Sequence, residues 1–105
     1  MIALSLAKLQ CRVLHDREDD LIQTYIEAAL SAFEDYTGRK LYADEAALAQ
    51  DQDAPEHTAI IDSKIIAGAL ILIGHLYTAR DLNAEYPETT TRLWWPYKVF
   101  FGGLI

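Results

Sequence analysis

The segment Asp19–Gly38, DDLIQTYIEAALSAFEDYTG, carries the clearest structural signal in the chain. Its apolar side chains recur at intervals of three and four residues, which places them on one face of an α-helix. They are Ile22, Tyr25, Ile26, Ala29, Leu30, Phe33 and Tyr36. Asp16 is the expected N-terminal cap, and Gly38 readily adopts the left-handed conformation that ends a helix. We therefore predict a long helix over about residues 17–37.

A second long helix is predicted over about residues 58–81, and it is apolar on nearly every side from Ile65 to Tyr77. The uninterrupted apolar run spans about 13 residues, fewer than the roughly 20 that a membrane-crossing helix requires, so we expect no membrane insertion. A helix of this kind is otherwise buried all round, in the core or between subunits. Because a small domain has limited means of covering it, we expect part of it at a subunit interface.

The remaining segments complete a small all-α bundle of one domain, residues 1–105, in which the two long helices are antiparallel. Ser5 is expected to cap a short N-terminal helix. Residues 41–57 are predicted to be rich in loops, with an extended Leu41–Tyr42 pair and a helical turn or two within 43–50. Residues 92–105 form a C-terminal helical or extended arm, in which Pro96 should interrupt a helix begun at Thr91.

The charge balance excludes one class of function. The chain has 16 acidic and 9 basic side chains, a net charge of −7 at pH 7 and a pI near 4.7. Proteins that grip nucleic acid normally present clustered Lys and Arg to the phosphates. We therefore expect no surface that binds DNA tightly. The single cysteine, Cys11, leaves no intrachain disulfide to predict.

Catalytic and metal-binding motifs are not recognisable in the sequence. His15, His57 and His75 are far apart, and no pair has the spacing of metal ligands on a helix. His75 lies in the apolar helix, where a hydrogen-bonded core histidine is the expectation. The acidic run from Asp16 to Asp20 is explained by its position at a helix start. We predict that the protein is not an enzyme and needs no cofactor or metal.

The C-terminal arm is unusually aromatic, since it holds Trp94, Trp95, Tyr97, Phe100 and Phe101. We expect about half of these rings to close the core, but together with Leu104 and Ile105 they exceed what a terminal segment of one such core needs. Large aromatic side chains also dominate protein–protein contacts. We therefore predict an interface with other subunits or partners. The candidate residues are these five rings together with Ile66, Leu70, Ile73, Tyr77 and Arg80.

The order of these features resembles the small head–tail connector proteins of tailed bacteriophages and prophages, also called DNA-packaging or head-completion proteins. Three segments carry most of the resemblance: SLAKLQCRVLHDREDDLI (5–22), AFEDYTGRKL (32–41) and ALILIGHLYTARD (69–81). The second contains Tyr36-Thr37-Gly38-Arg39, and the third closes on Leu76, Tyr77 and Arg80. A terminal segment with Leu93, Pro96, Tyr97 and Lys98 also fits. Two features depart from the family: the link with Cys11 and Leu14 is usually more polar, and the tail beyond Val99 is more apolar than expected.

The resemblance implies an all-α subunit of a ring, dodecameric when assembled, beneath the portal of the filled capsid. Such a ring extends the DNA channel, contacts the portal protein and the tail-completion proteins, and catalyses no reaction. Double-stranded DNA passes through it without specific binding. The protein would be made in the cytoplasm of the bacterial host and end in the virion neck.

Seven acidic residues become candidates for the channel wall, because carboxylates repel the phosphates of sliding DNA. They are Asp16, Glu18, Asp19, Asp20, Glu27, Glu34 and Asp35. An ordinary solvated helix face explains them equally well. A different function also stays open: an acidic all-α interaction or regulatory module, acting as a monomer or dimer.

Overall fold

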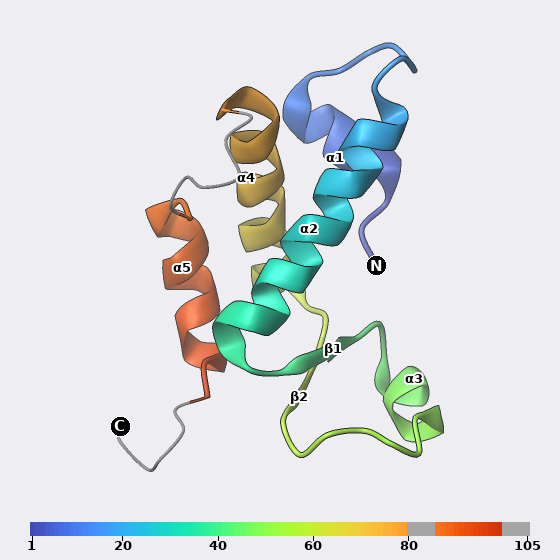
Figure 1. Ribbon diagram of the computed structural model, residues 1–105, viewed down its shortest axis with the longest axis vertical. Coiled ribbons are helices and arrows are strands. Elements are labelled where there is room, and N and C mark those ends of the chain that lie inside the picture. The colour runs from blue at the N-terminus through green and yellow to red at the C-terminus, as the bar shows by residue number, and fades with distance from the viewer. Residues whose placement is uncertain (80–85, 100–105) are drawn as a thin grey trace.

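The computed structural model describes residues 1–79 and 86–99 and has the all-α architecture that the sequence predicts (Figure 1). Its α-helices are α1 (Leu4–Cys11), α2 (Asp19–Thr37), α3 (Glu45–Gln50), α4 (Ser63–Ala79) and α5 (Glu88–Trp94). The strands β1 (Lys40–Tyr42) and β2 (Thr58–Ile60) pair in parallel, and the 3-10 helix η1 (Trp95–Tyr97) follows α5. The long helices α2 and α4 run antiparallel, with α1 and α5 on opposite sides of the pair.

Helix α2 buries the apolar face that the sequence predicts, with Ile22, Ile26, Ala29 and Phe33 almost fully covered. Its C-terminus also agrees with the prediction. Gly38 takes a left-handed conformation with φ 77°, and its amide donates to the Glu34 carbonyl at 2.8 Å. The helix starts two residues later than predicted, and the predicted cap at Asp16 was wrong. The helix begins at Asp19 rather than 17, and the Asp16 carboxylate accepts from Lys8 Nζ at 3.1 Å and caps no helix.

Helix α1 begins one residue before Ser5, so the prediction that Ser5 caps it was wrong. Ala3 occupies the cap position and provides no side-chain hydrogen bond to the first turn. Ala7 is fully buried and lets α1 approach the bundle closely. Arg12 ends the helix in a left-handed conformation with φ 58°, which costs a residue that has a Cβ roughly 1 kcal/mol.

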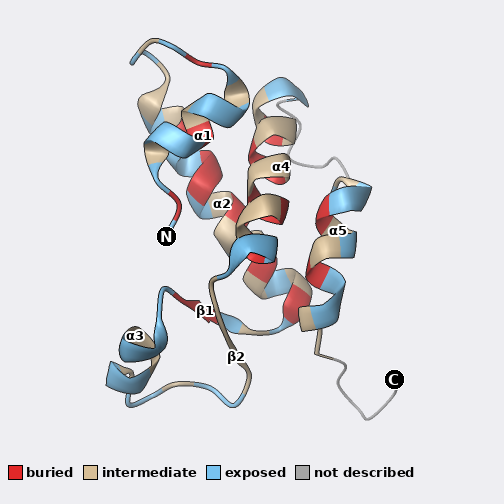
Figure 2. Ribbon diagram, turned by 180° about the vertical axis from the view of Figure 1, so that it is seen from behind, coloured by how far each residue is buried: buried red, intermediate tan, exposed pale blue. Residues whose placement is uncertain are grey.

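Helix α4 is the central element, because α1, α2 and α5 all pack against it (Figure 2). Ile65, Ala69, Leu72, Ile73 and Leu76 are buried. Much of the apolar surface that we assigned to a subunit interface is therefore covered inside the subunit. The predicted start at 58 was also wrong, because residues 58–60 form strand β2 beside β1. Asp62 then caps the helix, and its Oδ1 accepts from the Ile65 amide at 2.9 Å.

The C-terminal segment packs closely on α4. Trp94 is fully buried, and its ring meets that of Phe33 edge-to-face at 5.3 Å. The hydroxyl of buried Thr90 donates to the Gly68 carbonyl at 2.9 Å, which fixes α5 on α4. The helix starts at Glu88 rather than Thr91. Pro96 lies in η1, so the predicted interruption at this proline is confirmed.

Candidate functional site

The described residues of the predicted interface fall into three groups. Ile73 and Trp94 are fully buried inside the subunit, so neither is available to another protein in this structure. Ile66, Leu70, Tyr77 and Tyr97 are half-buried, and the last three pack against the core. Trp95 is 54% exposed and is the most accessible of the described candidates. Arg80, Phe100 and Phe101 lie outside the described residues.

A larger exposed apolar surface, which the sequence analysis missed, lies on and just after α1. Leu6, Leu9 and Leu14 are exposed, Leu9 by 72% and Leu14 by 97%. Leu9 and Leu14 line a hollow of about 490 Å³ together with Ser5, Lys8, Arg12 and Val13. The available signal was Leu6 and Leu9, three residues apart on one side of the first helix, followed by Leu14 in the link to the next helix. Large apolar side chains exposed together mark interaction sites more often than single ones do.

The seven candidate channel residues separate by their contacts. Asp16 and Asp19 pair with Lys8 Nζ at 3.1 and 2.8 Å, and the hydrogen bonds to Asp19 and Asp16 raise the pKa of Lys8. These two carboxylates therefore fasten the α1–α2 link. Oε2 of Glu34 accepts from the Leu41 amide at 2.8 Å and holds β1 against α2. Glu18 is half-buried.

The other three, Asp20, Glu27 and Asp35, are exposed along α2. Glu27 follows Asp20 by seven residues and Asp35 follows Glu27 by eight, and each interval is about two helical turns. The three residues therefore share the helix face opposite the buried one. None of the three has an ion-pair partner within residues 1–79 and 86–99. We call Asp20, Glu27 and Asp35 the α2 acidic stripe.

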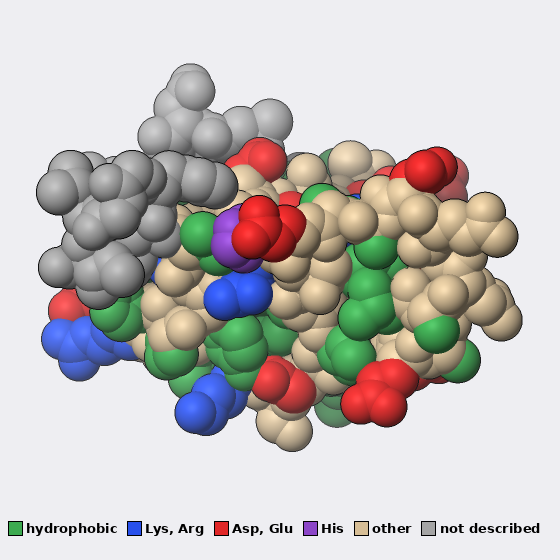
Figure 3. All heavy atoms as spheres, turned by 90° about the horizontal axis from the view of Figure 1, so that it is seen from below, with side chains coloured by type: hydrophobic (Ala, Val, Ile, Leu, Met, Phe, Trp, Pro, Cys, Tyr) green, Lys and Arg blue, Asp and Glu red, His purple; other side chains and the backbone are tan. Residues whose placement is uncertain are grey.

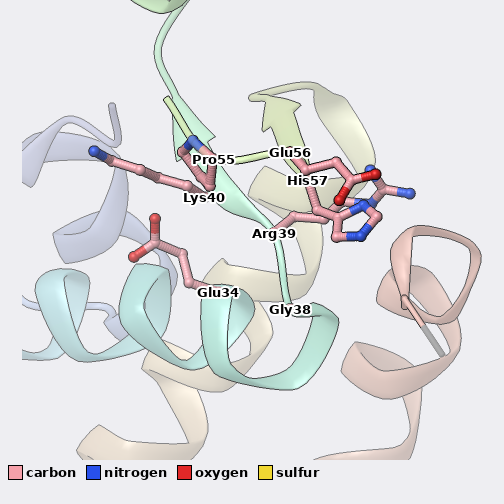
Figure 4. Close-up of a pocket in the computed structure, with 7 residues that line it drawn as sticks. All are labelled: Glu34, Gly38, Arg39, Lys40, Pro55, Glu56 and His57. Carbon is pink, nitrogen blue, oxygen red and sulfur yellow. The ribbon is translucent and has the colours of Figure 1, made fainter. Parts of the chain in front are cut away.

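A second hollow, of about 470 Å³, lies where α2 passes into β1 (Figure 4). In the figure, the Glu56 and His57 side chains lie beside the Arg39 guanidinium, and Lys40 points away from it. Arg39 Nε donates to the Tyr97 carbonyl at 2.6 Å, and a terminal nitrogen donates to the Thr58 carbonyl at 3.1 Å. These bonds tie η1 and β2 to the end of α2, which gives Arg39 in the Tyr-Thr-Gly-Arg segment a structural role.

Tyr97 makes a further connection between the C-terminal segment and α4. Its hydroxyl donates to Asp62, the residue that caps α4. Partial burial and this hydrogen bond raise the pKa of Tyr97 to about 12. The predicted C-terminal arm is also anchored through Val99, whose amide donates to the Thr37 carbonyl at 2.8 Å.

The region between the paired strands projects from the bundle, with α3 at its tip (Figure 1). No residue of α3 is buried. Oδ2 of Asp51 holds it in place by accepting from the Tyr42 hydroxyl at 2.5 Å and from Lys40 Nζ at 3.0 Å. These contacts, the Tyr42 hydrogen bond first, lower the pKa of Asp51 below its ordinary 3.8. Around this projection, the underside of the molecule shows separate apolar patches between scattered charges (Figure 3).

Replacing Asp51 with Ala should detach α3 without unfolding the bundle. We expect hydrogen–deuterium exchange of the residue 45–50 amides to accelerate, while the core amides of α2 and α4 keep their protection. Because the pKa of Asp51 is lowered, its carboxylate stabilises the attachment of α3 fully above pH 3.8. This stabilisation is lost as the pH falls through the lowered pKa. Acid should therefore loosen α3 in the wild type but not in the variant. Asp53→Ala, an exposed neighbour, is the control, and equal exchange in both variants would contradict this role.

The described residues offer no arrangement typical of an enzyme or a metal site. Among residues 1–79 and 86–99, no three His, Cys, Asp or Glu side chains are grouped to hold a metal ion. His75 is half-buried, and its Nε2 has no hydrogen-bond partner in the described part of the chain, contrary to our expectation. No described helix is both long and apolar enough to span a membrane.

The geometry thus consists of a helical bundle with surfaces suited to contact and no catalytic cluster among its described residues. No curated protein and no solved structure matches the chain. A family model described as "Phage gp6-like head-tail connector protein" matches residues 1–91, which is most of the 105-residue chain. The match includes all three long segments on which the resemblance rests. The chain therefore belongs to the phage gp6-like head-tail connector proteins, a structural family of the phage head–tail junction.

Proposed function

We propose that the protein is a ring-forming adaptor beneath the portal of a phage or prophage capsid, where it joins head to tail and extends the DNA channel. Membership of the connector family carries this proposal. The exposed apolar surfaces on α1 and at Trp95 support it, because a subunit that assembles must leave such side chains uncovered. The portal protein lies on one side of the ring and the tail-completion proteins on the other. The subunits wait in the host cytoplasm and end in the virion neck.

In this proposal Asp20 and Glu27 of the α2 acidic stripe face the channel, whereas Asp35, at its C-terminal end, lies at the flank beside Tyr86. Asp20, Glu27 and Asp35 are exposed and carry no described counter-ion, so their field reaches into solvent. Carboxylates that line a wall repel the DNA phosphates and prevent the duplex from sticking as it slides. The Asp16, Asp19 and Glu34 carboxylates are already engaged with Lys8 or the Leu41 amide, and we leave them out of the wall.

Charge reversal on the stripe tests this role. We expect wild-type rings to leave linear duplex DNA unretarded in gel mobility. Rings of Asp20→Lys/Glu27→Lys should retain it at about 50 mM salt and release it at about 200 mM. The matched control is Glu45→Lys/Asp53→Lys, which makes the same charge change on and near α3, where both residues are exposed. If the control retained DNA and the α2 variant did not, the stripe would lie outside the channel.

A further inference from the structure

We propose that neighbouring subunits of the ring meet through two unlike surfaces, the α1 side of one copy and the α5 side of the next. The α1 side is Leu6, Leu9, Leu14 and Arg12. The α5 side is Tyr86 and Trp95, at the two ends of α5, with Asp35 beside Tyr86. This inference rests on the proposed ring and names the contact that builds it.

The α1 side has the properties of an unoccupied interface. Leu14 is exposed almost as fully as in an extended chain. Leu9 lines the same hollow as Leu14. Arg12 lines the same hollow, is exposed, and has no ion-pair partner among the described residues. Arg12 ends α1 in a left-handed conformation with φ 58°, and Leu14, two residues later, is 97% exposed. Exposed leucines beside a cation with no described ion-pair partner favour a contact with another protein over a solvated link.

The α5 side offers apolar rings and a negative charge. Trp95 is 54% exposed, and Tyr86 is 38% exposed at the other end of α5. The Tyr86 ring lies 6.3 Å from that of Tyr36 and 6.5 Å from that of Trp94, so it extends the aromatic core to the surface. Burial raises the pKa of the Tyr86 hydroxyl, and the negative charge of nearby Asp35, which is exposed, raises it further.

The placement of the two sides suits a ring. α1 and α5 lie on opposite flanks of the α2/α4 pair in both views of the bundle. A contact between different patches on opposite flanks repeats from copy to copy and closes into a ring when the rotation allows. Helix α2 lies between α1 and α5 (Figure 1), and its exposed residues Asp20 and Glu27 remain free to face a channel.

The charges favour a contact between the α1 side and the α5 side over a two-fold contact between two α1 sides. A two-fold contact centred on the hollow that Arg12 lines would bring Arg12 of one copy toward Arg12 of the other. The proposed contact sets the Arg12 cation of one copy against the acidic α5 side of its neighbour, where Asp35 lies. Opposite charges across an interface fix its register and reject the wrong partner.

The experiment compares assembly of the full chain by sedimentation velocity and negative-stain electron microscopy. Leu9→Ser/Leu14→Ser should raise the concentration needed for rings at least about tenfold, because two anchor side chains are lost. Leu9→Met/Leu14→Met keeps apolar side chains and should assemble. Arg12→Glu and Asp35→Arg should each impair rings, and the combined charge swap should restore them. Thermal unfolding of each variant reports whether the monomer still folds.

Mixing separates the unlike contact from a symmetric one. Leu9→Ser/Leu14→Ser keeps its α5 side, and Trp95→Ser/Asp35→Asn keeps its α1 side. Neither should self-associate, whereas an equimolar mixture at about 100 µM, near a weak interface's expected Kd, should form a one-to-one dimer. Dimers of the second variant alone would indicate a symmetric α1 contact and overturn the proposal. Normal rings from Leu9→Ser/Leu14→Ser would overturn the proposed contact while leaving the ring function intact. A wild type that forms no ring, alone or on the portal, would instead contradict the proposed function.

Discussion

Replacing Trp94 with alanine is expected to lower the free energy of unfolding by about 3–5 kcal/mol. The side chain is fully buried between the helices, and its ring contacts Phe33 of α2 edge-to-face at 5.3 Å. Its Nε1 donates to the Ile65 carbonyl of α4 at 3.3 Å. One indole therefore joins α2, α4 and α5, and its removal leaves a cavity where three helices meet. A domain of this size has only about 5–15 kcal/mol of stability, so the loss is severe.

The adjacent tryptophan provides the control. Trp95 is 54% exposed, and Trp95→Ala should lower the unfolding free energy of the monomer by no more than about 1.5 kcal/mol, well below the loss at Trp94. Urea denaturation at a concentration too low for assembly measures both variants. Equal losses for the two tryptophans would show that the described packing of α5 is wrong.

Gly68→Ala is expected to destabilise the bundle by about 1–3 kcal/mol, although it replaces glycine with a better helix former. On helix propensity alone the change would stabilise α4 by about 1 kcal/mol. A Cβ on Gly68, however, would overlap the Trp94 indole, which is buried and has no room to withdraw. Any movement of α5 away from α4 to relieve this overlap would also strain the Thr90 hydrogen bond to the Gly68 carbonyl. The free energy lost to steric overlap at residue 68 therefore exceeds the free energy gained in helix propensity.

Gly74, in the same helix, is the matched control. A Cβ there would meet the Gln10 side chain at 3.5 Å, an ordinary contact, so Gly74→Ala should be neutral or stabilising by up to about 1 kcal/mol. A double-mutant cycle of Gly68→Ala with Trp94→Ala should be strongly non-additive, because the smaller side chain removes the overlap. Additive losses in urea denaturation would mean that Gly68 and Trp94 do not touch.

Long, periodic elements could be predicted from the sequence, because their apolar spacing and their ends are local properties. The α2 face, its end at Gly38 and the extended Leu41–Tyr42 pair are confirmed. Strand β2 was missed because three residues acquire strand geometry only through pairing with β1, a tertiary contact. The same holds for Asp16, whose carboxylate meets Lys8 across a turn rather than its own helix.

The candidate surfaces were less predictable, since exposure depends on which neighbour covers a side chain. Trp94 and Trp95 are adjacent and chemically identical, yet one is buried and the other half-exposed because α5 packs one face on α4. Leu14 looked like part of an apolar link and is almost fully exposed. The acidic residues differ in the same way: Glu34 binds an amide of β1, whereas Asp20 and Glu27 face solvent.

The central claim, that this connector works as a ring, is tested most directly by imaging the purified protein with the portal protein of its phage. Negative-stain electron microscopy, with light scattering across concentration, should show closed rings with an open centre, alone or seated on the portal. Particles that stay monomeric or dimeric at every concentration, and remain so on the portal, would contradict the ring and favour a small acidic interaction module instead.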